Sequence, residues 1–150
     1  MAQSLACLHY HFIFSTKNRA NAIAPVLQQR LYDYMGGVFK NLKGRLLAAG
    51  GTRDHVHLLA SLRPRLAVSD ILRDVKANSS KWVHETFPDF RSFGWQDSFG
   101  AFTVSYSGIE EVREYISNQE RHHQSMTFQQ EFLLFLERHG IEYDPEHVWG

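Results

Sequence analysis

Apolar residues recur along the chain with two different periods, one typical of β-strands and the other of α-helices. Strand patterns predict four strands, at residues 5–15, 45–49, 54–62 and 99–105. Spacings of three and four residues between apolar side chains predict helices at residues 25–42, 69–87, 107–123 and 127–138. The first six elements follow the order β-α-β-β-α-β, which predicts an α+β protein with the ferredoxin-like (split βαβ, RRM-like) fold.

Capping and turn residues lie near the predicted helix ends. Pro25 suits the first turn of a helix, where the missing N–H group of proline costs no hydrogen bond. Gly44 is placed to end that helix. Capping-box sequences, in which a Ser or Thr is followed three residues later by Glu or Gln, begin at Ser107 and Thr127. The helix that follows Thr127 is interpreted as packing or dimer support.

In the predicted fold, the two helices that connect the strands cover one face of an antiparallel sheet. Val56 and Leu58 point to that covered face, because the side chains of a strand alternate between its two sides. His55 and His57 then point to the opposite face, which is open for a substrate or for another element. We expect the third helix to pack there.

The composition is that of a folded globular protein, and its 150 residues predict a single domain spanning residues 1–150. Lys plus Arg and Asp plus Glu number 16 each, so the chain lacks the bulk positive charge of many nucleic-acid-binding proteins. The single cysteine, Cys7, excludes an internal disulfide and lies in an apolar run that predicts a buried thiol. No apolar run reaches about 18 residues, so neither export nor membrane insertion is indicated, and a reducing cytoplasm fits.

Two imidazoles on one face of a strand are half of a metal site, since they can share one cation. His55 and His57 have this arrangement, but such pairs also arise by chance in a chain with nine histidines. A hydrogen-bonded surface feature is the more common explanation of an isolated pair. His9 and His11 form a second pair with the same spacing, for which packing or hydrogen bonding within the sheet is the favoured interpretation.

The third predicted helix could complete a metal site. Tyr115 and Gln119 are four residues apart and therefore stack on one side of that helix. If the helix docks on the open face of the sheet, Gln119 could supply a third ligand. Tyr115 would then stand beside the ion, where its hydroxyl could attack a phosphodiester. The periodicity alone favours simpler roles, a packing tyrosine and a surface amide.

Three sequence blocks in a fixed order resemble one known family. They are Asp54-His55-Val56-His57-Leu58-Leu59, the block from Trp95 to Ser105 and the block from Glu114 to His123. Together with Tyr10-His11-Phe12 and Phe128-Gln129-Gln130-Glu131, they make the chain similar to the single-tyrosine (Y1) transposases of the IS200/IS605 family. These enzymes belong to the HUH endonucleases, in which two histidines flank a bulky apolar residue, here Val56.

The resemblance implies a prokaryotic, DNA-associated transposase that cleaves and rejoins single-stranded DNA at insertion-sequence ends and recognises DNA hairpins. His55, His57 and Gln119 would hold Mg²⁺ or Mn²⁺, with Mn²⁺ favoured by the softness of the ligands. Tyr115 would be the catalytic nucleophile and form a transient 5′-phosphotyrosine, which stores the bond energy so that no nucleotide cofactor is needed. Members of the family act as homodimers, and in some of them the tyrosine helix serves the partner's metal site.

The neutral charge and the absence of a long basic tail differ from many relatives associated with repetitive extragenic palindromes, and they favour the compact insertion-sequence type. Hairpin binding would then depend on a few well-placed groups. The candidates for DNA contact are Lys17, Arg19, Lys76, Lys81 and the aromatic side chain of Trp95. A solvated or packing role is at least as ordinary for each of them.

Two other functions share parts of this pattern. A relaxase-type or replication-initiator nickase uses the same tyrosine and histidine chemistry, but this short chain has no helicase or long accessory segment. A domesticated, non-catalytic binder of hairpins or single strands could keep the same fold. The combination of Tyr115, His55, His57 and Gln119 disfavours the binder, because binding needs no nucleophile.

Overall fold

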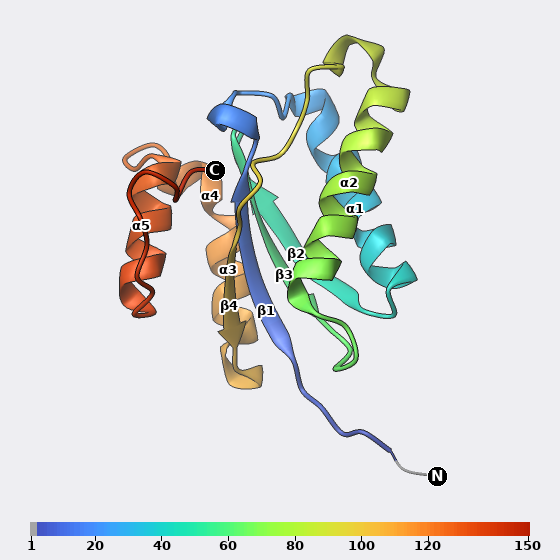
Figure 1. Ribbon diagram of the computed structural model, residues 1–150, viewed down its shortest axis with the longest axis vertical. Coiled ribbons are helices and arrows are strands. Elements are labelled where there is room, and N and C mark those ends of the chain that lie inside the picture. Colours follow the sequence, from blue (N-terminus) through green and yellow to red (C-terminus); the bar gives the residue numbers. More distant parts are fainter. Residues whose placement is uncertain (1–2) are drawn as a thin grey trace.

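The computed structural model describes residues 3–150 and contains a four-stranded antiparallel sheet in the order β2-β3-β1-β4 (Figure 1). The strands are β1 (His9–Ser15), β2 (Arg45–Gly51), β3 (His55–Ser61) and β4 (Gly100–Val104). The two central strands pair over their whole length, with Phe12 opposite Leu58 and Ser15 opposite His55. The predicted ferredoxin-like α+β fold is confirmed.

The segment before β1 differs from the prediction, because the strand begins at His9 rather than at Leu5. His9 pairs with Ser61, the last residue of β3. The strand β3 is therefore too short to pair with the residues that precede His9. Cys7 is therefore exposed, and the prediction of a buried thiol is wrong.

Two long helices, α1 (Pro25–Asn41) and α2 (Val68–Thr86), cover one face of the sheet as predicted (Figure 1). The main hydrophobic core lies between these helices and the sheet, and it includes the fully buried side chains of Val56, Leu58 and Phe14. Removal of these apolar surfaces from water is the principal force that holds the helices on the sheet.

The end of α1 also differs from the prediction. Lys43, not Gly44, takes the left-handed backbone conformation, with a φ of 64°. Gly44 meets a different requirement, because a methyl group on its Cα would lie 2.8 Å from the carbonyl oxygen of Ser61. The glycine therefore permits the end of the helix to approach β3 closely.

Three shorter helices lie on the other face of the sheet (Figure 1). They are α3 (Ile109–Ser117), α4 (Gln119–His122) and α5 (Phe128–Arg138). Ile116 of α3 packs on Leu59 of β3, and Phe132 of α5 packs on Ile13 of β1. The predicted docking of the tyrosine-bearing helix on this face is confirmed.

The third predicted helix is interrupted and begins differently from the prediction. A 3-10 turn, η3 (Tyr106–Gly108), precedes α3, so that Gly108 rather than Ser107 is the N-cap and the predicted capping box does not form. The helix then breaks at Asn118, which separates α3 from α4. The capping box of Thr127 does form at the start of α5, as predicted.

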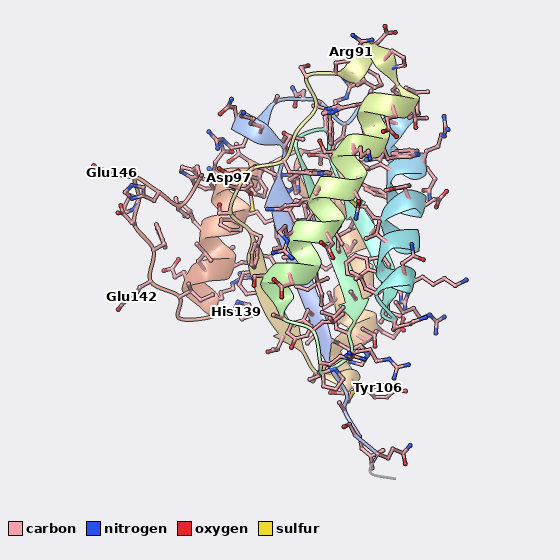
Figure 2. All side chains as sticks on the ribbon, turned by 45° about the vertical axis from the view of Figure 1, so that its right-hand side comes forward. Arg91, Asp97, Tyr106, His139, Glu142 and Glu146 are labelled. Atoms are coloured by element: carbon pink, nitrogen blue, oxygen red, sulfur yellow. The ribbon has the colours of Figure 1, made fainter. Side chains whose placement is uncertain are left out.

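The remaining connections contain two further 3-10 turns, η1 (Lys17–Arg19) and η2 (Pro88–Phe90). The C-terminal segment with Glu142 and Glu146 runs along the side of α5 that faces away from α2 (Figure 2). Trp149, near the end of this segment, packs on α5. Among the described residues, no helix is both long and apolar enough to cross a membrane.

Candidate active site and metal centre

The four residues predicted for catalysis and metal binding meet beneath α3, α4 and α5. His55 and His57 of β3 are fully buried on the face predicted for them. Gln119 begins α4 and is also buried, with its amide oxygen 2.9 Å from His55 Nε2. Tyr115 of α3 is half-buried, and its ring centre lies 5.8 Å from that of His57.

The centre of the cluster is a carboxylate that the sequence analysis did not assign to the site. Glu131 lies in the first turn of α5 and is 1% exposed. Its carboxylate accepts hydrogen bonds from the Tyr115 hydroxyl and, at 3.0 Å, from Gln119 Nε2. His57 Nε2 and His123 Nε2 lie 2.8 and 3.0 Å from Glu131 Oε1. Glu131 therefore joins the tyrosine to the predicted metal ligands.

A sequence signal for Glu131 was present. Phe128, Phe132 and Phe135 form an apolar stripe along α5, and Glu131 lies on that stripe, three residues after Phe128 and four before Phe135. A carboxylate inside an apolar helical stripe indicates a buried polar site, because such a group is rarely buried without a partner. The interpretation of α5 as support alone missed this acid.

The other ring nitrogen of His55 also has a fixed partner. His55 Nδ1 lies 2.7 Å from Asp54 Oδ1, and because a carboxylate only accepts, Nδ1 donates. The other ring nitrogen, Nε2, faces the amide oxygen of Gln119 at 2.9 Å. A cation bound between these two atoms would have both as ligands. An imidazole whose far nitrogen donates to a carboxylate is the usual arrangement of a metal-binding histidine.

His57 is oriented by a histidine of the neighbouring strand. His57 Nδ1 lies 2.8 Å from His11 Nε2. Burial lowers the pKa of His57 to about 4, and burial together with the nearby His57 lowers the pKa of His11, so both rings are neutral at pH 7. Hydrogen bonding within the sheet, the interpretation favoured for His11, is confirmed, but its contact with a predicted ligand was not foreseen.

Burial and charge set the ionisation of the cluster. Burial alone would raise the pKa of the Glu131 carboxyl, but hydrogen bonds from His123 and His57 hold that pKa well below its usual range. Burial, reinforced by the Glu131 carboxylate, raises the pKa of Tyr115. Near neutral pH, Glu131 is therefore ionised and Tyr115 keeps its proton when no cation is bound.

The donor atoms are spaced like the ligands of one cation. One ligand atom from each of His55, His57, His123 and Glu131 lies within 4.8 Å of the others. The oxygen of Gln119 lies 2.9 Å from His55 Nε2 and 3.1 Å from His123 Nε2. Neighbouring ligands of an octahedral ion with bonds of about 2.1 Å are roughly 3 Å apart. The residues present therefore fit a divalent metal site that includes two residues, His123 and Glu131, missing from the predicted ligand set.

Two of the residues predicted to contact DNA are committed to contacts inside the protein. The Lys76 ammonium donates to the carbonyl oxygens of residues 96, 97 and 98 at 3.0, 3.2 and 2.7 Å, and burial lowers its pKa to about 8. Trp95 is buried, and its indole N–H donates to Ser79 Oγ at 2.9 Å. Both side chains hold the segment before β4 against α2, and their contact with DNA stays a prediction.

Of the other three candidates for DNA contact, two share the turn η1 and the third lies on α2. Lys17 is exposed in η1, whereas Arg19 of the same turn lies over the ring of Trp149 at 5.6 Å. Lys81 is exposed on α2, on the opposite side of the sheet from the site, and lies 4.0 Å from Glu85. The structure therefore does not gather these cations into one patch, and their contact with DNA stays a prediction.

The chain is similar in sequence to known transposases. A family model described as "Transposase IS200 like" matches residues 4–119. The chain belongs to this family. It is 26% identical over 117 residues to the ISDra2 transposase TnpA of Deinococcus radiodurans, which covers 75% of this chain and 84% of that one. It is also 26% identical over 116 residues to the transposase for insertion sequence element IS200 of Salmonella typhimurium, covering 73% of this chain and 75% of that one.

Two solved structures resemble this IS200-like transposase. A putative transposase from Deinococcus radiodurans R1 is 25% identical, with a TM-score of 0.63 over 79% of this chain and 98% of that one. A REP-associated tyrosine transposase bound to a REP hairpin is 16% identical, with a TM-score of 0.59 over 82% of this chain and 74% of that one. The second likeness concerns the fold alone.

The family match ends at Gln119, so His123 and Glu131 lie beyond it. Membership in the family identifies a transposase, an enzyme that cuts and joins DNA strands. The two added residues of the cluster follow from the structure of this chain.

Proposed function

We propose that this transposase is a metal-dependent HUH enzyme that cleaves and rejoins single-stranded DNA at insertion-sequence ends through a 5′-phosphotyrosine on Tyr115. The observation that carries the proposal is the hydrogen bond from the Tyr115 hydroxyl to Glu131, in the same cluster as His55 and His57. A nucleophile and a set of metal-ligand side chains in mutual contact are the two parts that metal-assisted phosphoryl transfer needs.

His55, His57 and Gln119 would hold a Mg²⁺ or Mn²⁺ ion, with Glu131 and His123 as further ligands. When bound, such an ion would polarise the scissile phosphate and neutralise the charge that develops on its oxygens. The imidazoles favour Mn²⁺ over Mg²⁺, whereas the amide and carboxylate oxygens suit both.

The side chains of the site position the nucleophile. Glu131 accepts the hydrogen bond of the Tyr115 hydroxyl, which fixes the direction of the phenolic oxygen and gives its proton an acceptor. Attack of that oxygen on phosphorus forms an O–P bond while the bond to the 3′ oxygen of the preceding nucleotide breaks. The leaving oxygen takes up a proton and departs as a 3′-hydroxyl. Attack by another 3′-hydroxyl reverses these changes, rejoins the strands and frees Tyr115.

DNA hairpins are the proposed substrate, and a homodimer is the proposed functional unit. The REP-associated transposase with the same fold is bound to a hairpin, which supports the first proposal. The second is supported by β2, an edge strand that contains no charged residue after Arg45. An uncharged edge strand permits pairing with another chain.

The function is tested by incubating the protein and Mn²⁺ with single-stranded oligonucleotides that contain hairpins, followed by denaturing electrophoresis. A protein–DNA band that survives denaturation is expected from the wild type and should be absent from Tyr115→Phe. Tyr106→Phe is the matched control, because Tyr106 is 77% exposed in η3 and does not belong to the metal-ligand cluster. An adduct that persists in Tyr115→Phe would exclude this nucleophile, and hairpin binding without any adduct would favour the non-catalytic binder.

A further inference from the structure

A pocket of about 690 Å³ opens beside the metal-ligand cluster. Its walls come from three segments, residues 21–28 at the start of α1, residues 52–54 before β3 and residues 120–130 between α4 and α5. His123 belongs to both the pocket and the cluster, and Asp54 lines the pocket while bonding His55. The pocket therefore adjoins the proposed site of cleavage, and its volume is typical of small-ligand sites.

The lining of the pocket combines apolar and amide side chains. Ile23, Met126 and Phe128 supply apolar surface. Asn21, Gln28, Gln124, Gln129 and Gln130 supply amides. An unpaired nucleobase has the complementary character, with apolar faces and with donors and acceptors along its edge. Amide side chains suit such edges because each presents a donor beside an acceptor.

The charges around the pocket favour a base over a run of phosphates. Arg53 is the single Lys or Arg side chain among the residues that line it, and the carboxylates of Asp54 and Glu120 oppose its charge. Asp54 is in addition engaged by His55. One cation is enough for a single phosphate contact but not for tracking a strand.

We propose that this pocket binds one unpaired nucleotide next to the scissile phosphate and reads its base through Gln28 and Gln129. The inference rests on the proposed function, since it assumes that single-stranded DNA is cleaved at Tyr115. Gln129 lies beyond residues 4–119, the part matched by the family model. Base preference at the cut would then be set partly by the connection between α4 and α5.

The test uses a library of single-stranded DNA with a randomised segment, incubated with the full-length protein and Mn²⁺. Covalent adducts and released strands are isolated under denaturing conditions and sequenced. Wild type should prefer one base at a position adjoining the cut, and Gln28→Ala and Gln129→Ala should each lose roughly tenfold of that preference, as expected for a lost bidentate contact. Arg53→Ala should lower the adduct yield about equally for all sequences.

Gln29→Ala is the matched control, because Gln29 follows Gln28 on α1, is exposed and does not line this pocket. It should keep the wild-type preference. Gln129→Glu preserves size but exchanges an N–H donor for an acceptor, so it should change the preferred base instead of abolishing preference. Adducts from the pocket variants with unchanged base preference would overturn this inference and leave the proposed function intact. A wild type that forms no adduct with any sequence would overturn the proposed function itself.

Discussion

The two faces of the sheet are equally buried but differ in what they bury. On the face covered by α1 and α2, Val56 and Leu58 lie among apolar side chains. On the face covered by α3, α4 and α5, the alternate residues His55 and His57 are just as deeply buried, but among polar groups. The first face gains stability from apolar burial. The second contains groups whose burial is unfavourable unless each has a partner.

The polar face offsets this penalty by mutual hydrogen bonds. His11, Gln119 and Glu131 are at most 3% exposed. His11 bonds His57, and Gln119 donates to Glu131, which also bonds His57. The atoms that satisfy one another are also the atoms that can bind a cation. Stability and chemistry are therefore divided between the two faces of the sheet, so mutations should separate them.

The largest effect, complete loss of adduct formation, is expected when the tyrosine and the metal-binding histidine are removed from different chains of a mixture. A mixture of Tyr115→Phe and His55→Ala should form no covalent adduct, because Tyr115, Glu131 and His57 meet within one chain and Ile116 buries α3 on its own sheet. Denaturing electrophoresis after co-expression of the two variants measures this. Recovery of the adduct in the mixture, with neither variant active alone, would show that the tyrosine acts in the partner subunit.

Substitutions on the two faces of β3 should have opposite consequences. Leu58→Ala should lower the free energy of unfolding by about 2–5 kcal/mol through the cavity that it leaves, while the folded fraction keeps its cleavage activity. His57→Ala should abolish cleavage with a smaller loss of stability. Urea denaturation and adduct formation are measured for both. A larger loss of stability in His57→Ala than in Leu58→Ala would reverse the division between the faces.

The metal affinity should depend on the carboxylate of α5. Glu131→Gln keeps the size of the side chain but removes its charge, and it should weaken Mn²⁺ binding by roughly tenfold or more. Isothermal titration of each protein with Mn²⁺ gives the affinities. Glu120→Gln provides the control, since Glu120 is exposed on α4 and is not a member of the metal-ligand cluster. Equal affinities for wild type and Glu131→Gln would remove Glu131 from the ligand set.

The smallest effect concerns the stability of the metal-free protein as a function of pH. His57 has a folded-state pKa of about 4 against a usual value of 6.5, so between these values the unfolded chain binds a proton that the folded chain does not. Stability should therefore fall, by about 1–3 kcal/mol, as the pH is lowered from 6.5 to 4. Glu131 acts in the same direction because its folded pKa is lowered, whereas the raised pKa of His123 opposes the change.

Denaturation midpoints measured in EDTA between pH 7 and pH 4 test this expectation. His57→Gln, which does not titrate, should give a flatter profile than the wild type. Wild-type stability that stays constant or rises over this interval would contradict a neutral, buried His57.

Local patterns determined more of the fold than of the site. Period-two alternation placed Val56 and Leu58 on the covered face because a strand has only two sides. Helix ends were less well predicted, since Ser107 carries a capping-box sequence but lies inside a 3-10 turn. Where the local sequence and the path of the chain agree, as at Thr127, the predicted cap is present.

The sequence by itself determined the strand order, the face on which His55 and His57 lie and, through its resemblance to a family, the tyrosine and amide that meet them. Only the tertiary structure decided that His11 and Glu131 join the site, 46 and 74 residues away from His57 in the chain. Periodicity assigns a residue to a face of its own element. It does not say which other element will cover that face, because this depends on the packing of the whole chain around the sheet.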